Sequence, residues 1–393
     1  MEQQTIFDIL YPKFKIDRPI RLIELFAGYG SQALALKYLG VKFEHWKICE
    51  WAVKSIQAYK DLHFTDDDIE VNLTKEEMVE LLYNKGISAD YNKPMTKEQI
   101  KRLSEDQLKR IVKNITITHN LVDIQQIKGE DLEIENTDFF TYLLTYSFPC
   151  QDLSLAGKGK GMSDTSTRSG LLWEVERILT ECKNKPQVLL MENVPQLHNQ
   201  ENMKDFYKWQ VRLEELGYKN YWQDLIATDY GIPQIRNRCF MVSILGDYSY
   251  TFPQPIPLKL KLKDMLEDQA DKKYYLSEKG IDYICGNAVN PNLRDHIDRG
   301  KAKLNKEIAY TVSTKQDRRC GDANFILEGF DETTVDDFLK IKNATNLGYL
   351  LAESGDGIDI SSRMEYHRGT VQKGKSQTIT TMGGEDVGVV VYE

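Results

Sequence analysis

Long hydrophobic runs are missing from this sequence, and with them the means of crossing a membrane. Even the run Val-Leu-Leu-Met at 188–191 ends at the acidic Glu192, far short of the roughly 18 apolar residues that a spanning helix needs. The first residues, Met1 to Gln4, are acidic and polar, without the basic start or the small-residue cleavage site of a signal peptide. We therefore expect a cytoplasmic protein with no membrane partner.

Paired cysteines and an excess of basic charge are also absent. The six cysteines include no CxxC pair and have no histidine array nearby, so neither a disulfide framework nor a metal site is predicted. Acidic residues outnumber basic ones by 60 to 51, a net charge of −9. This balance discourages indiscriminate binding to polyanions but is compatible with a basic cleft in an acidic protein.

The first 255 residues alternate between strand-like and helix-like patterns. Buried strands are expected at 21–26, 43–49, 139–147, 187–191, 221–227 and 239–245, with helices at 32–39, 52–59, 170–182 and 203–216. The charged stretch at about 65–110 contains three capping boxes, which predict a solvated helical insertion. The alternation predicts an α/β fold with a mostly parallel sheet, covered on both faces, and ligands at the carboxyl ends of its strands.

The proline-rich segment at 253–257 marks the predicted domain boundary. Beyond it the alternation of strands and helices is lost. We expect a larger domain at 1–255 and a smaller mixed domain at 256–393. With 393 residues, 41% of them hydrophobic, the chain is long enough for both cores.

A glycine turn follows the first strand. Gly28 and Gly30 lie between that strand and a helix, where backbone N–H groups and the positive helix end can face a ligand. Glu50, at the end of the second strand, can accept hydrogen bonds from a ribose diol. The pair indicates a nucleoside-bearing cofactor, although such a turn can also serve tight packing alone.

Two later strands end in residues with reactive side chains. Cys150 follows the strand at 139–147 and precedes a segment rich in glycine and lysine; its thiolate could attack a substrate, or it could be a buried structural cysteine. Glu192 ends the next strand in a mostly apolar setting, which favours a protonated carboxyl and suits a proton donor. A structural salt bridge is the alternative for Glu192.

Gln234, Arg236 and Arg238 alternate along the chain, so an extended segment would place them on one face. Two guanidinium groups on one face can clamp phosphates or a base oxygen. A surface ion-pair strand is the alternative.

Together, these motifs resemble the DNA cytosine-5 methyltransferase family of bacterial and phage type. The resemblance rests on Phe-Ala-Gly-Tyr-Gly at 26–30, Pro-Cys-Gln at 149–151, Glu-Asn-Val at 192–194 and Gln-x-Arg-x-Arg at 234–238, in this order. Asp123-Ile124, Asp-Tyr-Gly-Ile-Pro at 229–233, and Arg168, Glu174 and Arg177 reinforce it. It covers about 20–255 and implies a Rossmann-like sheet that binds S-adenosylmethionine, with a smaller target-recognition domain.

The resemblance implies methyl transfer from S-adenosylmethionine to carbon 5 of a cytosine flipped out of a specific duplex DNA sequence. Its catalytic residues would be Cys150, which adds to carbon 6, Glu192, which donates to N3, and Arg236 and Arg238, of which Arg238 holds the cytosine O2. For the cofactor, the family's positions correspond to Phe26, Gly28, Gly30, Glu50 (ribose), Trp51 (adenine), Asp123 and Ile124 (base edge) and Pro149. DNA contacts are expected from Gln151, Ser154, Lys158, Gln234, Arg236, Arg238, Lys315, Arg318 and Arg319, although a solvated turn also explains the last three.

The sequence departs from the family pattern in places. Glu24 stands where the first motif usually has aspartate, and the family's last two motifs are not found between 367 and 393. We read Gly286-Asn287 as a coincidental match to the final one. These departures predict either a second polypeptide that supplies the missing segment or a noncatalytic DNA-binding regulatory homologue. An RNA-directed relative and a generic nucleotide-binding protein are further alternatives, and a restriction-modification system or phage is the expected context.

Overall fold

The computed structural model describes residues 12–65, 69–149 and 169–266, with seven short strand segments between 309 and 391. Packing divides the chain into two compact units, Met1–Asp224 with Arg238–Phe252, and Leu225–Asn237 with Pro253–Glu393. The division into domains at 255 and 256 stays a prediction.

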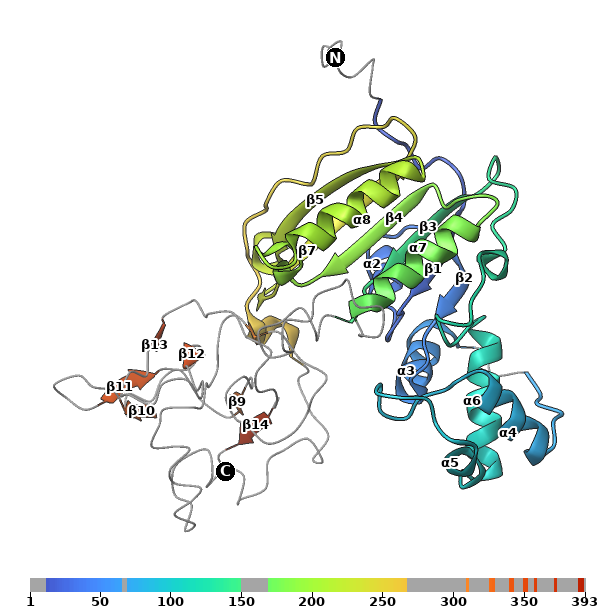
Figure 1. Ribbon diagram of the computed structural model, residues 1–393. Helices are drawn as coiled ribbons and strands as arrows, with labels where there is room; N and C mark the ends of the chain where they lie inside the picture. Colours follow the sequence, from blue (N-terminus) through green and yellow to red (C-terminus); the bar gives the residue numbers. More distant parts are fainter. Residues whose placement is uncertain are drawn as a thin grey trace. The chain divides into compact units, whose positions relative to one another are not determined.

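A six-stranded sheet forms the centre of the first unit (Figure 1). Its strand order is β2-β1-β3-β4-β7-β5. β1 pairs in parallel with β2 and β3, and β3 with β4, whereas β7 runs antiparallel to β4. The predicted α/β fold with a mostly parallel sheet is confirmed. The strands are β1 (Ile20–Leu25), β2 (Phe43–Cys49), β3 (Thr141–Tyr146), β4 (Val188–Asn193), β5 (Tyr218–Ile226) and β7 (Asn237–Leu245).

Helices cover both faces of this sheet. Helices α7 (Leu172–Glu181) and α8 (Met203–Glu215) lie on one face, and α2 (Ser31–Tyr38) lies behind the other (Figure 1). Alternate residues of β1 separate the two cores: Ile23 packs with the α7 and α8 side, and Leu22 with Ala33 of α2. Both faces are apolar, which explains why β3 is buried along its whole length.

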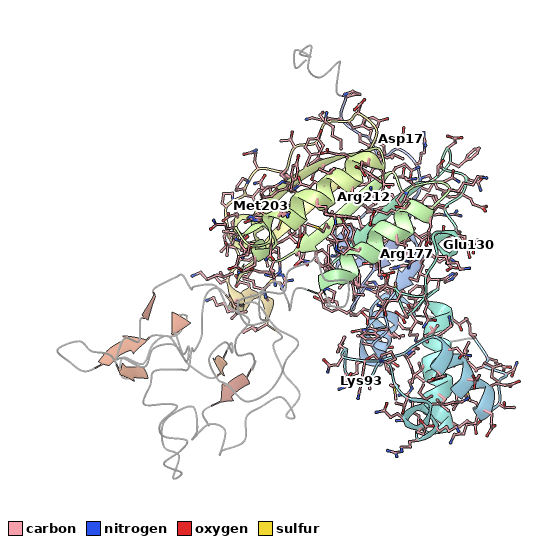
Figure 2. All side chains as sticks on the ribbon, in the orientation of Figure 1. Asp17, Lys93, Glu130, Arg177, Met203 and Arg212 are labelled. Atoms are coloured by element: carbon pink, nitrogen blue, oxygen red, sulfur yellow. The ribbon has the colours of Figure 1, made fainter. Side chains whose placement is uncertain are left out.

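A surface ion pair joins the two helices that share a face. Arg212 of α8 donates from Nε to Oε1 of Glu176 in α7 at 2.7 Å, and Figure 2 shows Arg212 and Arg177 on these neighbouring helices. Exposed pairs of this kind contribute about 0–1 kcal/mol. The apolar faces beneath them therefore contribute most of the stability of this layer.

A helical insertion follows α3 (Val53–His63). It consists of α4 (Lys75–Asn84), α5 (Lys97–Lys101) and α6 (Glu105–Ile117). All three predicted capping boxes are present, at the starts of these helices. Helix α6 continues beyond the predicted end of the insertion near 110. The helices also bury a core of their own against α3, so only their outer faces are solvated. This core contains Ile56, Met78, Leu82, Ile100, Leu108 and Ile111.

The second unit contains short strand pairs. β6 pairs in parallel with β8 and β9 with β14, while β10–β11 and β12–β13 are antiparallel. These strands are β6 (Gln234–Ile235), β8 (Ala309–Tyr310), β9 (Phe325–Glu328), β10 (Leu339–Lys342), β11 (Tyr349–Ala352), β12 (Gly357–Ile358), β13 (Val371–Gln372) and β14 (Gly388–Val391).

Short 3₁₀ turns also occur within the described residues, at η1 (Gly129–Leu132), η3 (Ser169–Leu171), η4 (Pro195–His198), η5 (Ala227–Asp229) and η6 (Leu262–Met265). Among the helices of the described segments, none is long and apolar enough to span a lipid bilayer.

Candidate active site

The carboxyl ends of four strands meet at one edge of the sheet. Leu25 of β1 is in register with Cys49 of β2 and Tyr146 of β3, and Tyr146 with Met191 of β4. The segments that follow these strands therefore start side by side. They contain most of the cofactor and catalytic positions that the sequence predicts within the described residues.

The glycine turn after β1 is built from left-handed backbone. Phe26, Gly28 and Gly30 all have positive φ, and Gly30 is the N-cap of α2. A Cβ on Gly30 would lie 2.3 Å from Nε2 of His63, whereas a Cβ on Gly28 would meet nothing within 4 Å. Tight packing therefore explains Gly30, while Gly28 faces open space beside the backbone, as a bound ligand requires.

Glu50 fastens the segment after β2 to this turn. Its Oε2 accepts from the backbone N–H of Gly28 at 2.9 Å, and its Oε1 from Ala52 at 2.7 Å. Burial raises the pKa of Glu50 to about 7, and the backbone hydrogen bonds oppose this rise. Each carboxylate oxygen still has acceptor capacity for a hydroxyl donor.

Asn120 is a site residue that the sequence analysis missed. Its Oδ1 accepts from the backbone N–H groups of Glu50 at 3.1 Å and Val122 at 2.9 Å, and its Nδ2 donates to the carbonyl oxygen of Glu50 at 2.9 Å. The side chain is 4% exposed. Asn120 thus holds the segment after β2 against the segment that contains Asp123.

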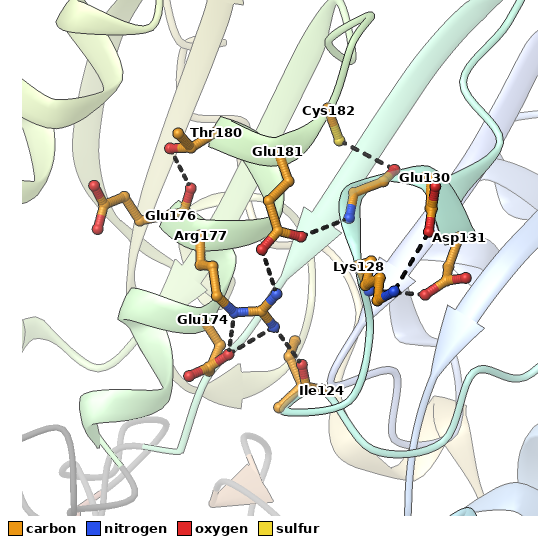
Figure 3. Close-up of polar contacts among 11 residues, drawn as sticks. Ile124, Lys128, Glu130, Asp131, Glu174, Glu176, Arg177, Thr180, Glu181 and Cys182 are labelled. Carbon is orange, nitrogen blue, oxygen red and sulfur yellow. Dashed lines mark hydrogen bonds and ion pairs between the residues drawn. The ribbon is translucent and has the colours of Figure 1, made fainter.

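Arg177 of α7 supports the loop with Asp123 and Ile124. Its Nη2 donates to the carbonyl oxygen of Ile124 at 3.2 Å. Glu174 and Glu181 pair with the same guanidinium, at 2.7 and 2.9 Å (Figure 3). Asp123 itself accepts from the backbone N–H of the residue two positions later. The family resemblance gave Arg177 only as a matching position. The structure shows that it contacts the backbone of the loop with Asp123 and Ile124.

Trp51, the residue after Glu50, contacts the helical insertion. Trp51 is half-buried and packs against the core of the helical insertion. The insertion therefore supports one wall of the predicted cofactor site. Whether Trp51 also packs on adenine stays a prediction, as do the ligand contacts expected of Phe26 and Pro149.

Glu24 has a structural role behind the glycine turn. It is buried, accepts from the Tyr59 hydroxyl at 2.6 Å and from the Ala33 N–H at 3.3 Å, and so joins β1 to α2 and α3. Burial raises the pKa of Glu24 to about 7. The longer glutamate is accommodated at the position where the family usually has aspartate.

Glu192 and Arg238 form an ion pair at the end of β4. Oε1 of Glu192 lies 3.1 Å from Nε of Arg238, and their side chains are 16% and 20% exposed. The antiparallel register pairs Glu192 with Phe240, so Arg238 is its diagonal neighbour on the same face. The apolar setting predicted for Glu192 is wrong, because β7 places a guanidinium beside it. A salt bridge was the alternative interpretation of Glu192, and the structure shows one. Its two members are both predicted catalytic residues.

Asn193 connects this pair to the strand that leads to Cys150. Its Nδ2 donates to the carbonyl oxygen of Phe148 at 3.1 Å, and its Oδ1 accepts from the N–H of Val194 at 2.8 Å. The backbone two residues before Cys150 is thereby fixed next to Glu192. Four predicted site residues of the following segment lie outside the described residues: Cys150, Gln151, Ser154 and Lys158.

Gln234, Arg236 and Arg238 do not share one extended strand. Gln234 belongs to β6, which pairs with β8 in the second unit, whereas Arg238 belongs to β7 of the central sheet. Between them, the N–H of Arg236 donates to the carbonyl oxygen of Gln234 at 3.0 Å, a tight turn that interrupts the alternation. The prediction of one extended segment is therefore wrong, and the common face of the two arginines stays a prediction. Lys315, Arg318 and Arg319 lie outside the described residues.

Comparison with known proteins identifies the class to which this fold and site belong. The model of the family "C-5 cytosine-specific DNA methylase" matches residues 83–319. The chain belongs to this family, and the sequence resemblance is confirmed.

Two curated relatives match most of the chain. The type II methyltransferase M2.ScrFI of Lactococcus lactis subsp. cremoris is 37% identical over 283 residues, 71% of this chain and 74% of the relative. The orphan methyltransferase M.SssI of Spiroplasma monobiae is 40% identical over 298 residues, 74% of this chain and 73% of the relative.

Solved structures show weaker likeness. The Entamoeba histolytica methyltransferase EhMeth has a TM-score of 0.48 at 13% identity, covering 76% of this chain and 72% of its own. The S. pombe Dnmt2 methyltransferase has a TM-score of 0.40 at 15% identity over 67% of this chain, which spans 64% of the Dnmt2 chain.

Proposed function

We propose that this methyltransferase transfers a methyl group from S-adenosylmethionine to carbon 5 of a flipped cytosine in a specific duplex DNA sequence. The observation that carries the proposal is the Glu192–Arg238 ion pair at 3.1 Å, next to the Asn193 hydrogen bond that fixes the backbone before Cys150. An acid, a guanidinium and a strand end bearing a thiol are the groups that this reaction needs at one place. The family description names DNA as the methylated molecule, and the name of the relative M2.ScrFI favours a type II enzyme.

Carbon 5 of cytosine is a weak nucleophile, and we assign its activation to Cys150 and Glu192. The Cys150 thiolate adds to carbon 6 while Glu192 donates a proton to N3, so that carbon 5 acquires enamine character. After methyl transfer, carbon 5 loses its proton to a base, the returning electron pair expels the Cys150 thiolate, and N3 returns its proton to Glu192. The enzyme is thereby regenerated.

Arg238 has two tasks in this scheme. Before the base arrives, its ion pair holds the Glu192 carboxyl in position at the strand end. When cytosine enters, we assign to Arg238 the hydrogen bonds to the O2 atom and a neighbouring phosphate, since a guanidinium offers five donors in a fixed fork. We assign the DNA backbone to Arg236 and Gln234, and target recognition to the domain at 256–393.

The cofactor site suits S-adenosylmethionine in its donor set and its space. Bound there, this cofactor supplies an electrophilic methyl group. Glu50 offers carboxylate oxygens to the ribose hydroxyls from the end of β2, as in dinucleotide-binding sheets. Gly28 leaves open space beside the turn, and Asn120 and Arg177 hold the second and third loops in place.

The direct test of the reaction is product analysis. Mixed-sequence duplex DNA is incubated with the chain and S-adenosylmethionine whose methyl group carries deuterium, then digested to nucleosides for mass spectrometry. We expect labelled 5-methylcytosine from the natural chain and from Glu215→Gln, a surface control on α8. Glu192→Gln should reduce the rate by about 10²–10⁴-fold, the usual contribution of a general acid.

The outcomes separate the alternatives. Labelled N4-methylcytosine or methyladenine would exclude the proposed chemistry. Methylation of RNA but not DNA would favour an RNA-directed enzyme. A folded chain that binds duplex DNA but yields no labelled nucleoside would favour a noncatalytic homologue or a split enzyme.

A further inference from the structure

Three potential metal ligands from separate segments come together next to the catalytic pair. They are His198 at the end of η4, Asp224 in β5 and Cys239 in β7, and their ligand atoms all lie within 4.8 Å of one another. Cys239 directly follows Arg238 and is in register with Asn193 of β4. Their spacing along the chain forms no metal-binding motif, and the sequence analysis accordingly predicted no metal site.

The contacts within this cluster show that its groups face each other. Nε2 of His198 lies 2.9 and 3.0 Å from the two carboxylate oxygens of Asp224, and the Cys239 thiol donates a hydrogen bond to Asp224. In a tetrahedral site with metal–N and metal–S distances of about 2.1 and 2.3 Å, neighbouring ligand atoms are about 3.3–3.6 Å apart. Shifts of about 1 Å would therefore bring the three groups into this geometry.

The chemistry and exposure of the ligands favour one class of ion. A thiolate, an imidazole and a carboxylate together match zinc-class divalent cations better than magnesium or calcium, which prefer oxygen ligands alone. The Cys239 side chain is fully buried, but those of His198 and Asp224 are 23% and 31% exposed. An ion can therefore approach from the side of His198 and Asp224.

We propose that His198, Asp224 and Cys239 bind one thiophilic divalent cation of the zinc class, with a water molecule in the fourth position. The thiol releases its proton to solvent when the metal–sulfur bond forms, so each binding event releases one proton. The ion would join η4, β5 and β7; β7 contains Arg238 and pairs with β4, which contains Glu192. Occupancy should consequently stabilise the first unit whether or not the chain methylates DNA.

Cobalt(II) provides the test, because it occupies zinc sites and reports a thiolate ligand by a charge-transfer band in the near ultraviolet. The full chain is stripped with chelator, dialysed and titrated with Co²⁺ alone. We expect one ion per chain and a thiolate band that Zn²⁺ abolishes. Cys239→Ser should remove the band, while Cys182→Ser, a buried cysteine elsewhere in the same unit, and Cys150→Ser should retain it.

Two further variants test the other ligands. His198→Ala and Asp224→Asn should each weaken Co²⁺ binding by more than about tenfold, since even changes outside the ligand shell cost about 10–100-fold. If Cys239→Ser fails to fold, melting temperatures replace the comparison of its cobalt band with that of the natural chain. Zn²⁺ should then raise the melting temperature of the natural chain but not that of Asp224→Asn.

Two results would overturn the proposal. A folded natural chain without a thiolate band would show that the cluster is only a hydrogen-bonded group in which Asp224 accepts from His198 and Cys239. A band that persists in Cys239→Ser but disappears in Cys150→Ser would assign Co²⁺ to the other thiol.

Discussion

Replacing Asn120 by alanine should separate the second and third cofactor loops. The natural side chain makes three hydrogen bonds to backbone groups on either side of it, two to Glu50 and one to Val122, at 2.9–3.1 Å. Alanine can make none of them. Because the site is buried, the orphaned backbone groups of Glu50 and Val122 have poor access to water.

The magnitude follows from the contacts. A net hydrogen bond contributes about 1 kcal/mol, and an unsatisfied buried partner costs about 1–3 kcal/mol. Three such bonds imply that Asn120→Ala lowers the free energy of unfolding by about 3–5 kcal/mol. Asn114→Ala is the matched control: Asn114 is equally buried, at 4% exposure, but donates to the side chain of Gln57 in α3, so about 1 kcal/mol is expected.

Two assays check this expectation. Urea unfolding followed by circular dichroism gives the stability difference, and calorimetric titration with S-adenosylmethionine gives the affinity. We expect Asn120→Ala to weaken cofactor binding by about tenfold or more, equal to about 1.4 kcal/mol, and Asn114→Ala to leave it near the natural value. Equal stability losses in the two variants, with unchanged affinity in both, would refute the role given to Asn120.

Three other predictions follow from the same edge of the sheet. Because burial raises the pKa of Glu24 from 4.5 to about 7, the folded state holds a proton that the unfolded state has lost, and stability should fall as pH rises from about 4.5 to 7. Glu50, whose pKa is raised to the same value, acts in the same direction, so Glu24→Gln should reduce the fall in urea midpoints across this range by about half. Gly30→Ala should destabilise the fold by more than about 3 kcal/mol in thermal melts, because its left-handed backbone is strained for alanine and its Cβ would also overlap His63. Gly28→Ala meets no neighbour, so only the cost of its left-handed backbone remains, about 1–2 kcal/mol, and it should chiefly weaken cofactor binding; the reverse order would contradict the packing argument. Arg177→Leu should weaken S-adenosylmethionine binding several-fold without changing the turnover rate at saturating cofactor, and a lowered turnover rate with normal affinity would count against a supporting role.

Local sequence patterns predicted the framework well. The strand Phe43–Cys49 has the predicted bounds, and Thr74, Thr96 and Ser104 cap their helices as their spacing indicates. These features depend on residues a few positions apart, within the reach of periodicity and capping rules. Most other strand and helix ends differ from the predictions by one to a few residues.

Features that depend on long-range contacts were beyond these patterns. The three partners of Asn120 follow from the register of β2 against the loop after α6, which no local motif encodes. Arg238 reaches Glu192 because β7 runs antiparallel beside β4. Arg238 therefore lies in a different strand from Gln234, which belongs to β6. His198, Asp224 and Cys239 belong to three separate segments, so only the folded structure shows that they lie close together.

A mechanism-based trap shows whether Cys150 adds covalently to cytosine. Duplex DNA of mixed sequence containing 5-fluorocytosine is incubated with the chain, with and without S-adenosylmethionine, and resolved on a denaturing gel. Fluorine cannot leave carbon 5 as a proton does, so the adduct should persist. We expect a cofactor-dependent covalent complex in the natural chain and in Cys182→Ala, and none in Cys150→Ala. A complex that survives Cys150→Ala, or no complex from a folded chain that binds both DNA and cofactor, would contradict this expectation.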